Sequence, residues 1–199
     1  MKDFSPNPVR NSTRRCKPQK EKISNGANHY ERAFESWLID NRIQYIAVDE
    51  HKKAAFGRCK IKSFDFLLYP RNQQIIIAEV KGRLFKGTSF AKLAGFECWV
   101  TVEDIDGLAR WQEIFSAGRL TAGQGHKAVF VFAYKIEKVD VDFDGRDIYD
   151  FEANRYVLFA IKLDSYRQFM KPRSPKWQTV TLPAAQFRRC AVQVQNLFL

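Results

Sequence analysis

The alternation of hydrophobic and polar residues along the chain predicts both helices and strands. Four aromatic and aliphatic residues have the i, i+4, i+7, i+8 spacing of an amphipathic helix that ends near residues 40–41: Tyr30, Phe34, Trp37 and Leu38. Apolar runs predict strands at residues 43–48, 64–69, 75–80 and 127–136, and a helix at 103–115 precedes the last of them. The order is therefore helix, three strands, helix, strand. Short links between the three strands favour antiparallel pairing, and the flanking helices favour an α/β fold with a mixed sheet.

Shorter elements complete the expected organisation. Strands are predicted at residues 97–101, 156–163 and 177–182, helices at 164–170 and 184–189, and a hairpin turn at 71–74. We interpret residues 28–199 as a single domain, with a core over about 28–136 and a C-terminal extension over 137–199. Residues 1–27 are polar and rich in basic side chains, and are expected to form a flexible arm.

The charge balance indicates a polyanionic partner. The chain of 199 residues carries a formal net charge of +11, which favours nucleic acid or an anionic surface. The longest apolar run spans Ala128 to Tyr134, far short of the roughly 20 residues of a membrane helix. The first residues contain no apolar signal segment, so we expect a cytoplasmic or nucleoid-associated protein that is not secreted and has no membrane partner. The four cysteines and three histidines show no spacing typical of a zinc site.

Two strand-like segments carry ionisable groups that require an explanation. They read Lys-Ser-Phe-Asp-Phe-Leu, which contains Asp65, and Ile-Ala-Glu-Val-Lys-Gly, which contains Glu79 and Lys81. A buried carboxylate without compensation costs several kcal/mol. Glu79 and Lys81 point to the same face of a strand, and a hairpin turn would place Asp65 beside Glu79. Two carboxylates and one ammonium then converge, and oxygen ligands of this kind select Mg²⁺ or Mn²⁺. The alternative is a structural ion pair with Lys81 or a nearby arginine.

This constellation resembles the PD-(D/E)XK nuclease superfamily, which includes restriction endonucleases and Holliday-junction resolvases. Asp65, thirteen intervening residues and then Glu79-Val80-Lys81 match its motif, whereas Phe64 stands where the family name has proline. The resemblance covers about residues 28–136 and implies a restriction-endonuclease-like core. It also implies that Asp65, Glu79 and the Val80 carbonyl hold the metal, and that Lys81 stabilises the transition state or orients and deprotonates the attacking water.

The first helix offers a further acidic residue, because many members of this family carry a glutamate there that assists metal or water binding. On a helical wheel Glu31 lies about 20° from Leu38, and Glu35 lies about 40° further out. Glu31 is therefore the preferred fourth catalytic residue and a further metal ligand, although Asn28 and Glu31 also have the spacing of a helix-capping box. Glu35 is expected to be a solvated charge.

Basic and polar residues near these segments are candidates for nucleic-acid contact. Arg83 and Lys86 follow the third strand, which carries Glu79 and Lys81, and Arg110 and Gln112 lie on the second helix. The segment 170–177 is basic and ends in Trp177. One interpretation is that this segment binds phosphates and stacks on a base. The other, which is preferred, is that it is a loop whose tryptophan covers the core.

The sequence thus predicts a Mg²⁺- or Mn²⁺-dependent endonuclease that hydrolyses DNA. RNA stays open as a substrate, and a homodimer is compatible with the family. One alternative is a catalytically silent nucleic-acid-binding module on the same scaffold. Another is a protein-binding scaffold, which the net charge of +11 disfavours.

Overall fold

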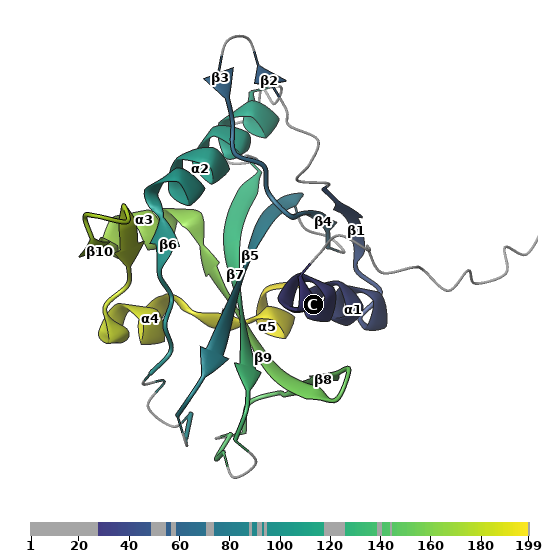
Figure 1. The fold of residues 1–199 in the computed structure, drawn as a ribbon. Helices are drawn as coiled ribbons and strands as arrows, with labels where there is room; N and C mark the ends of the chain where they lie inside the picture. The colour runs from purple at the N-terminus through teal and green to yellow at the C-terminus, as the bar shows by residue number, and fades with distance from the viewer. Residues whose placement is uncertain are drawn as a thin grey trace, which may run out of the picture.

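The protein folds around one mixed sheet with helices on both faces, as the computed structural model shows (Figure 1). The structure describes residues 28–48, 55–56, 59–70, 74–87, 89–90, 93, 95–117, 126–138, 141–143 and 145–198. The helices are α1 (His29–Asp40), α2 (Val102–Ser116), α3 (Leu163–Phe169), α4 (Ala184–Cys190) and α5 (Val194–Phe198). The central sheet contains β1 (Gln44–Ala47), β4 (Phe66–Tyr69), β5 (Ile76–Phe85), β7 (Lys127–Ile136), β8 (Tyr149–Phe151), β9 (Asn154–Lys162) and β12 (Val192–Gln193). Short strands form two smaller sheets, one of β10 (Lys171–Ser174), β11 (Thr179–Thr181) and β6 (Val100–Thr101), and one of β2 (Ala55–Phe56) and β3 (Cys59–Lys60).

The central sheet combines antiparallel and parallel pairs. Its strand order is β1-β4-β5-β7-β9-β12, with β8 beside β9. Strands β1, β4 and β5 are antiparallel neighbours, β7 lies parallel to β5, and β9 lies antiparallel to β7. The predicted α/β class with a mixed sheet is therefore confirmed. The larger elements up to β7 also follow the predicted order of helix, three strands, helix and strand.

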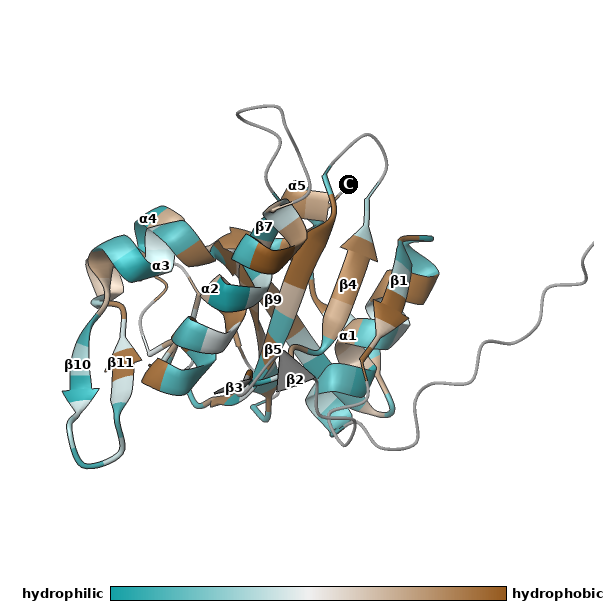
Figure 2. Cartoon of the chain, turned by 90° about the horizontal axis from the view of Figure 1, so that it is seen from above, coloured by the Kyte–Doolittle hydropathy of each residue, from teal (hydrophilic) through white to brown (hydrophobic). Residues whose placement is uncertain are grey.

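Strand β7 lies at the centre because both of its faces are apolar. Successive side chains of a strand point to opposite faces. Phe130, Phe132 and Tyr134 therefore enter the core beneath α2, which we call the α2-side core. Val129 and Val131 enter the core beneath α1, which we call the α1-side core. Figure 2 shows the hydrophobic sheet strands enclosed by helices whose outer surfaces are hydrophilic.

Helix α1 begins and packs as its sequence predicts. Asn28 caps the helix by accepting hydrogen bonds from the backbone N–H groups of Tyr30 and Glu31. The apolar stripe of the helix is buried in the α1-side core. Residue Phe198 of α5 closes this core, with ring centroids 6.3 Å from Phe34 and 6.2 Å from Trp37. Segments far apart in the sequence thus complete one core, and α5 lies beside α1 in Figure 1.

The α2-side core is built from packed aromatic rings. Phe96 lies at its centre, with ring centroids 4.6 Å from Phe85, 4.7 Å from Tyr134 and 5.6 Å from Phe187. Phe187 belongs to α4, so the segment predicted as a C-terminal extension supplies part of this core. The same segment supplies β9 and β12 to the central sheet.

Strand β5 is longer than the sequence pattern indicated. The predicted strand ended at residue 80. Instead β5 continues to Phe85 because it stays paired with β7 as far as Phe85 and Ile136. Gly82 is required here because a Cβ atom would lie 2.0 Å from Cδ2 of Tyr30, whose ring packs over the strand.

Two expected features lie outside the described residues, namely the basic arm at 1–27 and most of the turn at 71–74. In the described part of the chain, no helix has the length and apolar character needed to cross a membrane.

Candidate active site

Asp65 lies at a bend immediately before β4, and not within the strand as predicted. Its backbone joins two strands, because Val48 donates a hydrogen bond to its carbonyl at 2.8 Å and its own N–H donates to Ala78 at 3.1 Å. Its carboxylate accepts a hydrogen bond from the backbone N–H of Val80 at 2.6 Å. Asp65 is only 6% exposed. The carboxylate is thus held against β5, at the residue between Glu79 and Lys81.

Glu79 and Lys81 lie on one face of β5, as their spacing predicted. Extending the β4–β5 register, in which Phe66 pairs with Ala78, places Asp65 opposite Glu79. Nζ of Lys81 lies 2.7 Å from Oε1 of Glu79, which is buried. Burial raises the pKa of Glu79, and the nearby ammonium of Lys81 opposes this rise. The two strands therefore bring the three motif residues to one place.

Two further charged residues complete this site, and neither was predicted from the sequence. Asp104 on α2 is 5% exposed and lies 3.1 Å from Nζ of Lys81. Lys62, three residues before Asp65, forms an ion pair with Asp104 and lies 3.6 Å from Glu79. We call Lys62, Glu79, Lys81 and Asp104 the four-charge network.

The ionisation of this network follows from burial and mutual attraction. Burial alone would raise the pKa of Asp104, but Lys81 and then Lys62 lower the pKa of Asp104 to about 2. Burial alone would lower the pKa of Lys81, but the carboxylates of Glu79 and Asp104 outweigh it and raise the pKa of Lys81 above its ordinary value. Lys81 therefore stays protonated throughout the neutral range.

Asp104 is fixed by the start of α2. Thr101 is the N-cap residue, and its hydroxyl accepts a hydrogen bond from the Asp104 N–H at 3.1 Å. The Asp104 carboxylate accepts one in return from the Thr101 N–H at 2.8 Å. This capping box has a sequence signature, Thr-x-x-Asp at the start of a predicted helix. That spacing could have marked Asp104 as an ordered carboxylate, whereas its lysine partners lie 23 and 42 residues away.

The two glutamates of α1 lie in different surroundings. Glu31 forms the capping box with Asn28, whose backbone N–H lies 3.3 Å from the Glu31 carboxylate. The neighbouring Tyr30 packs over Gly82, so the start of α1 lies beside the residue that follows Lys81. Glu35 was expected to be solvated, and this is wrong. Glu35 is 2% exposed and accepts a hydrogen bond from Tyr45 of β1 at 3.0 Å, because β1 covers that side of the helix.

The four predicted nucleic-acid contacts differ in their surroundings, and Arg83 is the one that is held by the fold. Arg83 donates to the carbonyls of Gly82 and Trp99, and its guanidinium lies 4.0 Å from the centroid of the Trp99 ring. Burial lowers the pKa of Arg83. Arg83 thus supports Trp99 and is not a freely extended phosphate ligand.

The other three predicted contacts lie away from the four-charge network. Lys86 is exposed just beyond β5, and Gln112 is half-buried on α2. Arg110 is exposed and pairs with Glu113 on its own helix at 3.0 Å. None of these side chains has a described contact with the motif residues. Their role in binding nucleic acid stays a prediction.

The donor set fits a hard divalent cation. Mg²⁺ is commonly held by one or two carboxylates together with water and substrate oxygens, and Asp65 and Glu79 are two buried carboxylates on adjacent strands. Over the described ranges, no group of three or more His, Cys, Asp or Glu side chains forms a ready metal cluster. A metal at this site would therefore take its other ligands from the Val80 carbonyl, water, the substrate or a rearranged Glu31.

Comparisons with known proteins leave the chemistry of this site as the basis for its function. No model of a known protein family matches the sequence, and no curated protein matches it either.

Proposed function

We propose that the chain is a metal-dependent nuclease of the PD-(D/E)XK type that hydrolyses phosphodiester bonds in DNA. The observation that carries the proposal is the convergence of the motif. The buried Asp65 carboxylate accepts a hydrogen bond from Val80, and Glu79 and Lys81 on either side of Val80 form an ion pair. The alternation of α1, three antiparallel strands, α2 and the parallel strand β7 supports a restriction-endonuclease-like core.

Asp65 and Glu79 are the residues that would hold Mg²⁺ or Mn²⁺, with the Val80 carbonyl and Glu31 as further ligands. When bound, such an ion supplies Lewis acidity and lowers the pKa of a coordinated water. The proteins of this family use that chemistry to cleave DNA, and the net charge of +11 suits the same polyanion.

We assign Lys81 the stabilisation of negative charge on the scissile phosphate. Its ammonium pairs with the carboxylates of Glu79 and Asp104, which raise its pKa. An ammonium has three N–H donors, and those of Lys81 reach Glu79 and Asp104, which leaves a third for an oxygen of the scissile phosphate. Lys62 is about one third exposed and supplies a second cation beside the same carboxylates.

The test is a cleavage assay on supercoiled, linear, single-stranded and branched DNA with Mg²⁺, Mn²⁺ or EDTA. We expect metal-dependent cleavage that falls about a hundredfold or more in Asp65→Asn and in Glu79→Gln. Asp106→Asn is the matched control, because Asp106 is an exposed carboxylate on the helix that carries Asp104. Equal cleavage by the parent and by Asp65→Asn would refute the assignment.

The alternative function is a catalytically silent module that binds nucleic acid. The ion pairs of the four-charge network favour it, since a carboxylate that is compensated by lysines does not require a metal. Salt-sensitive DNA binding without cleavage under any metal condition would support this alternative.

A further inference from the structure

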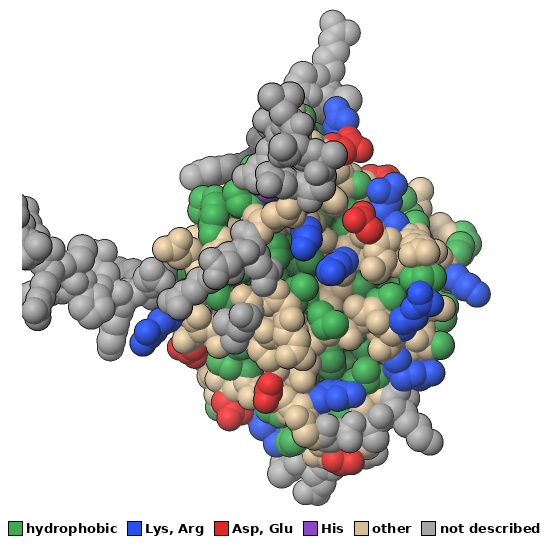
Figure 3. Space-filling model, turned by 180° about the vertical axis from the view of Figure 1, so that it is seen from behind, with side chains coloured by type: hydrophobic (Ala, Val, Ile, Leu, Met, Phe, Trp, Pro, Cys, Tyr) green, Lys and Arg blue, Asp and Glu red, His purple; other side chains and the backbone are tan. Residues whose placement is uncertain are grey.

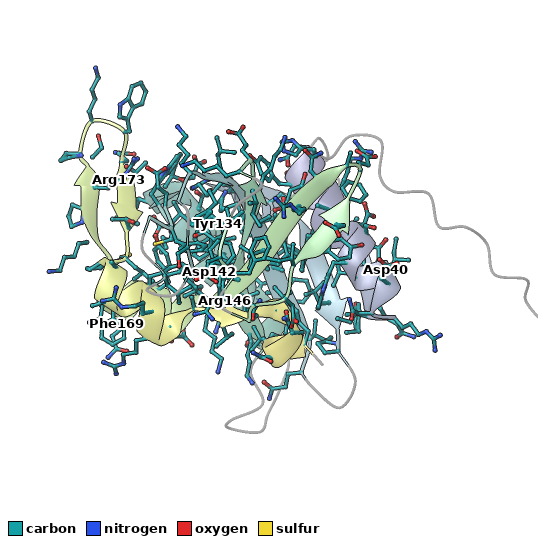
Figure 4. All side chains as sticks on the ribbon, turned by 90° about the horizontal axis from the view of Figure 1, so that it is seen from below. Asp40, Tyr134, Asp142, Arg146, Phe169 and Arg173 are labelled. Carbon is teal, nitrogen blue, oxygen red and sulfur yellow. The ribbon has the colours of Figure 1, made fainter. Side chains whose placement is uncertain are left out.

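Trp177 lies in the turn of the hairpin formed by β10 and β11. The preferred prediction that it covers the core is wrong. Its side chain is 70% exposed. The turn is ordered, because the strands pair through Lys171 and Thr181, and the N–H of Gln178 donates to the carbonyl of Pro175 at 3.2 Å. Figure 4 shows the hairpin that carries Arg173 projecting from the body of the protein. An indole is thus displayed at the tip of a fixed projection.

The surroundings of Trp177 are basic and aromatic. Residues 171–181 include Lys171, Arg173 and Lys176 and contain no acidic residue. Nζ of Lys176 lies 5.4 Å from the centroid of the Trp177 ring. Lys and Arg side chains gather on the right-hand side of Figure 3. This is the side on which α4 and β10 lie, at the left of Figure 1.

A second pairing of aromatic ring and cation lies at the base of the hairpin. The guanidinium of Arg173 lies 5.1 Å from the centroid of the Trp99 ring, and that of Arg83 lies 4.0 Å from the same centroid. Arg173 also lies 3.8 Å from the exposed Glu97. The aromatic and basic character therefore continues from the tip of the hairpin down to β5.

The hairpin is hydrogen-bonded to the start of α2, the helix that carries Asp104. The N–H of Val102, the first residue of α2, donates to the carbonyl of Gln178 at 2.8 Å. Asp104 follows on the same helical turn and pairs with Lys81. Arg83, beneath Trp99, lies two residues after Lys81 on the same strand. The hairpin surface is therefore separated from the four-charge network by only two residues along α2, from Val102 to Asp104, and by two along β5, from Arg83 to Lys81.

We propose that the hairpin surface, made of Trp99, Arg173, Lys176 and Trp177, binds a strand with an unpaired base beside the candidate active site. This inference rests on the proposed nuclease function and names its substrate class. An exposed indole stacks on a free base face, and cations beside it attract the flanking phosphates. Base faces inside an intact duplex are covered by their neighbours. The surface therefore selects nucleic acid with a single-stranded end, flap or branch.

The test is binding of the full chain in EDTA to a labelled oligonucleotide, measured by fluorescence anisotropy in two forms, single-stranded and annealed as a blunt duplex. Trp177→Ala should weaken single-strand binding about tenfold and leave duplex binding nearly unchanged. Trp177→Phe should restore most of the affinity, because it keeps an aromatic face. Ile46→Ala is the control, because Ile46 is 52% exposed on the edge strand β1, away from the hairpin.

Unchanged single-strand affinity in Trp177→Ala would overturn the inference, as would an equal loss on both probes or no binding by the parent. Cleavage of the same probes in Mg²⁺ separates this inference from the proposed function. If no probe is cleaved but single-strand binding depends on Trp177, the nuclease assignment fails and the binding surface stands. If the parent cleaves and Trp177→Ala binds the single strand normally, the binding surface alone fails.

Discussion

Replacing Asp104 by asparagine removes one charge from the four-charge network and changes little else. The asparagine side chain keeps a carbonyl oxygen that can accept the hydrogen bond donated by Thr101 at 2.8 Å. Lys62 and Lys81 lose a carboxylate partner and retain only Glu79 within the network. We expect D104N to destabilise the fold in a way that depends on pH.

The size of the effect follows from the pKa of Asp104. That pKa is about 2 in the folded protein, against an ordinary value of 3.8, and one pH unit of difference corresponds to about 1.4 kcal/mol. The charge of Asp104 therefore contributes about 2–3 kcal/mol of stability at neutral pH. Because folding lowers the pKa of this acid, the contribution is complete above about pH 5 and is lost as the pH falls from 3.8 through 2. About half of it remains at pH 3.

Urea unfolding of the parent and D104N at pH 7 and pH 3 measures this contribution. We expect a difference in unfolding free energy of about 2–3 kcal/mol at pH 7 that narrows to about 1 kcal/mol at pH 3. D106N, at an exposed position of the same helix, should differ from the parent by less than about 0.5 kcal/mol. A D104N difference that is the same at both pH values would refute the electrostatic explanation, and a difference as small as that of D106N would refute the network itself.

Three other substitutions test the local structure. Gly82→Ala would place a Cβ atom 2.0 Å from Cδ2 of Tyr30 and should cost about 1–3 kcal/mol in urea unfolding; adding Tyr30→Ala should remove the clash, and a fully stable single variant would contradict the packing. Tyr166→Phe removes the hydroxyl that donates to the buried carbonyl of Cys98 at 2.6 Å, so the free energy of unfolding should fall by about 1–3 kcal/mol; an unchanged melting temperature argues against that bond. Thr101→Ala removes the cap of α2 and should cost about 1 kcal/mol, which thermal unfolding would detect; a neutral result would mean that the cap does not hold the helix.

The elements that the sequence predicted well are those whose signals are local. Strand β7 has the bounds predicted from its apolar run, because both of its faces are buried. Helix α1 begins after Asn28, since the cap and the apolar stripe lie within one short segment. The antiparallel pairing of β4 and β5 follows from the short link between them.

The features that the sequence did not reveal depend on partners distant along the chain. The sequence around Glu35 predicts a solvated side chain, because its partner Tyr45 lies on a different element of the fold. Asp104 belongs to the candidate site only because the sheet brings Lys62 and Lys81 to the start of α2. The exposure of Trp177 likewise depends on a hairpin that pairs with β6 and not with the central sheet.

The contact of Phe198 with Phe34 and Trp37 has a consequence for the order in which the protein acquires its structure. Helix α1 is made early in synthesis, but its apolar face cannot be fully covered until the ribosome has polymerised α5. Contacts of such large sequence separation slow folding. Phe34 and Trp37 therefore lack the Phe198 contact while the rest of the chain is synthesised. A nascent chain that stalls before residue 198 would leave Phe34 and Trp37 without this cover and would be a substrate for chaperones.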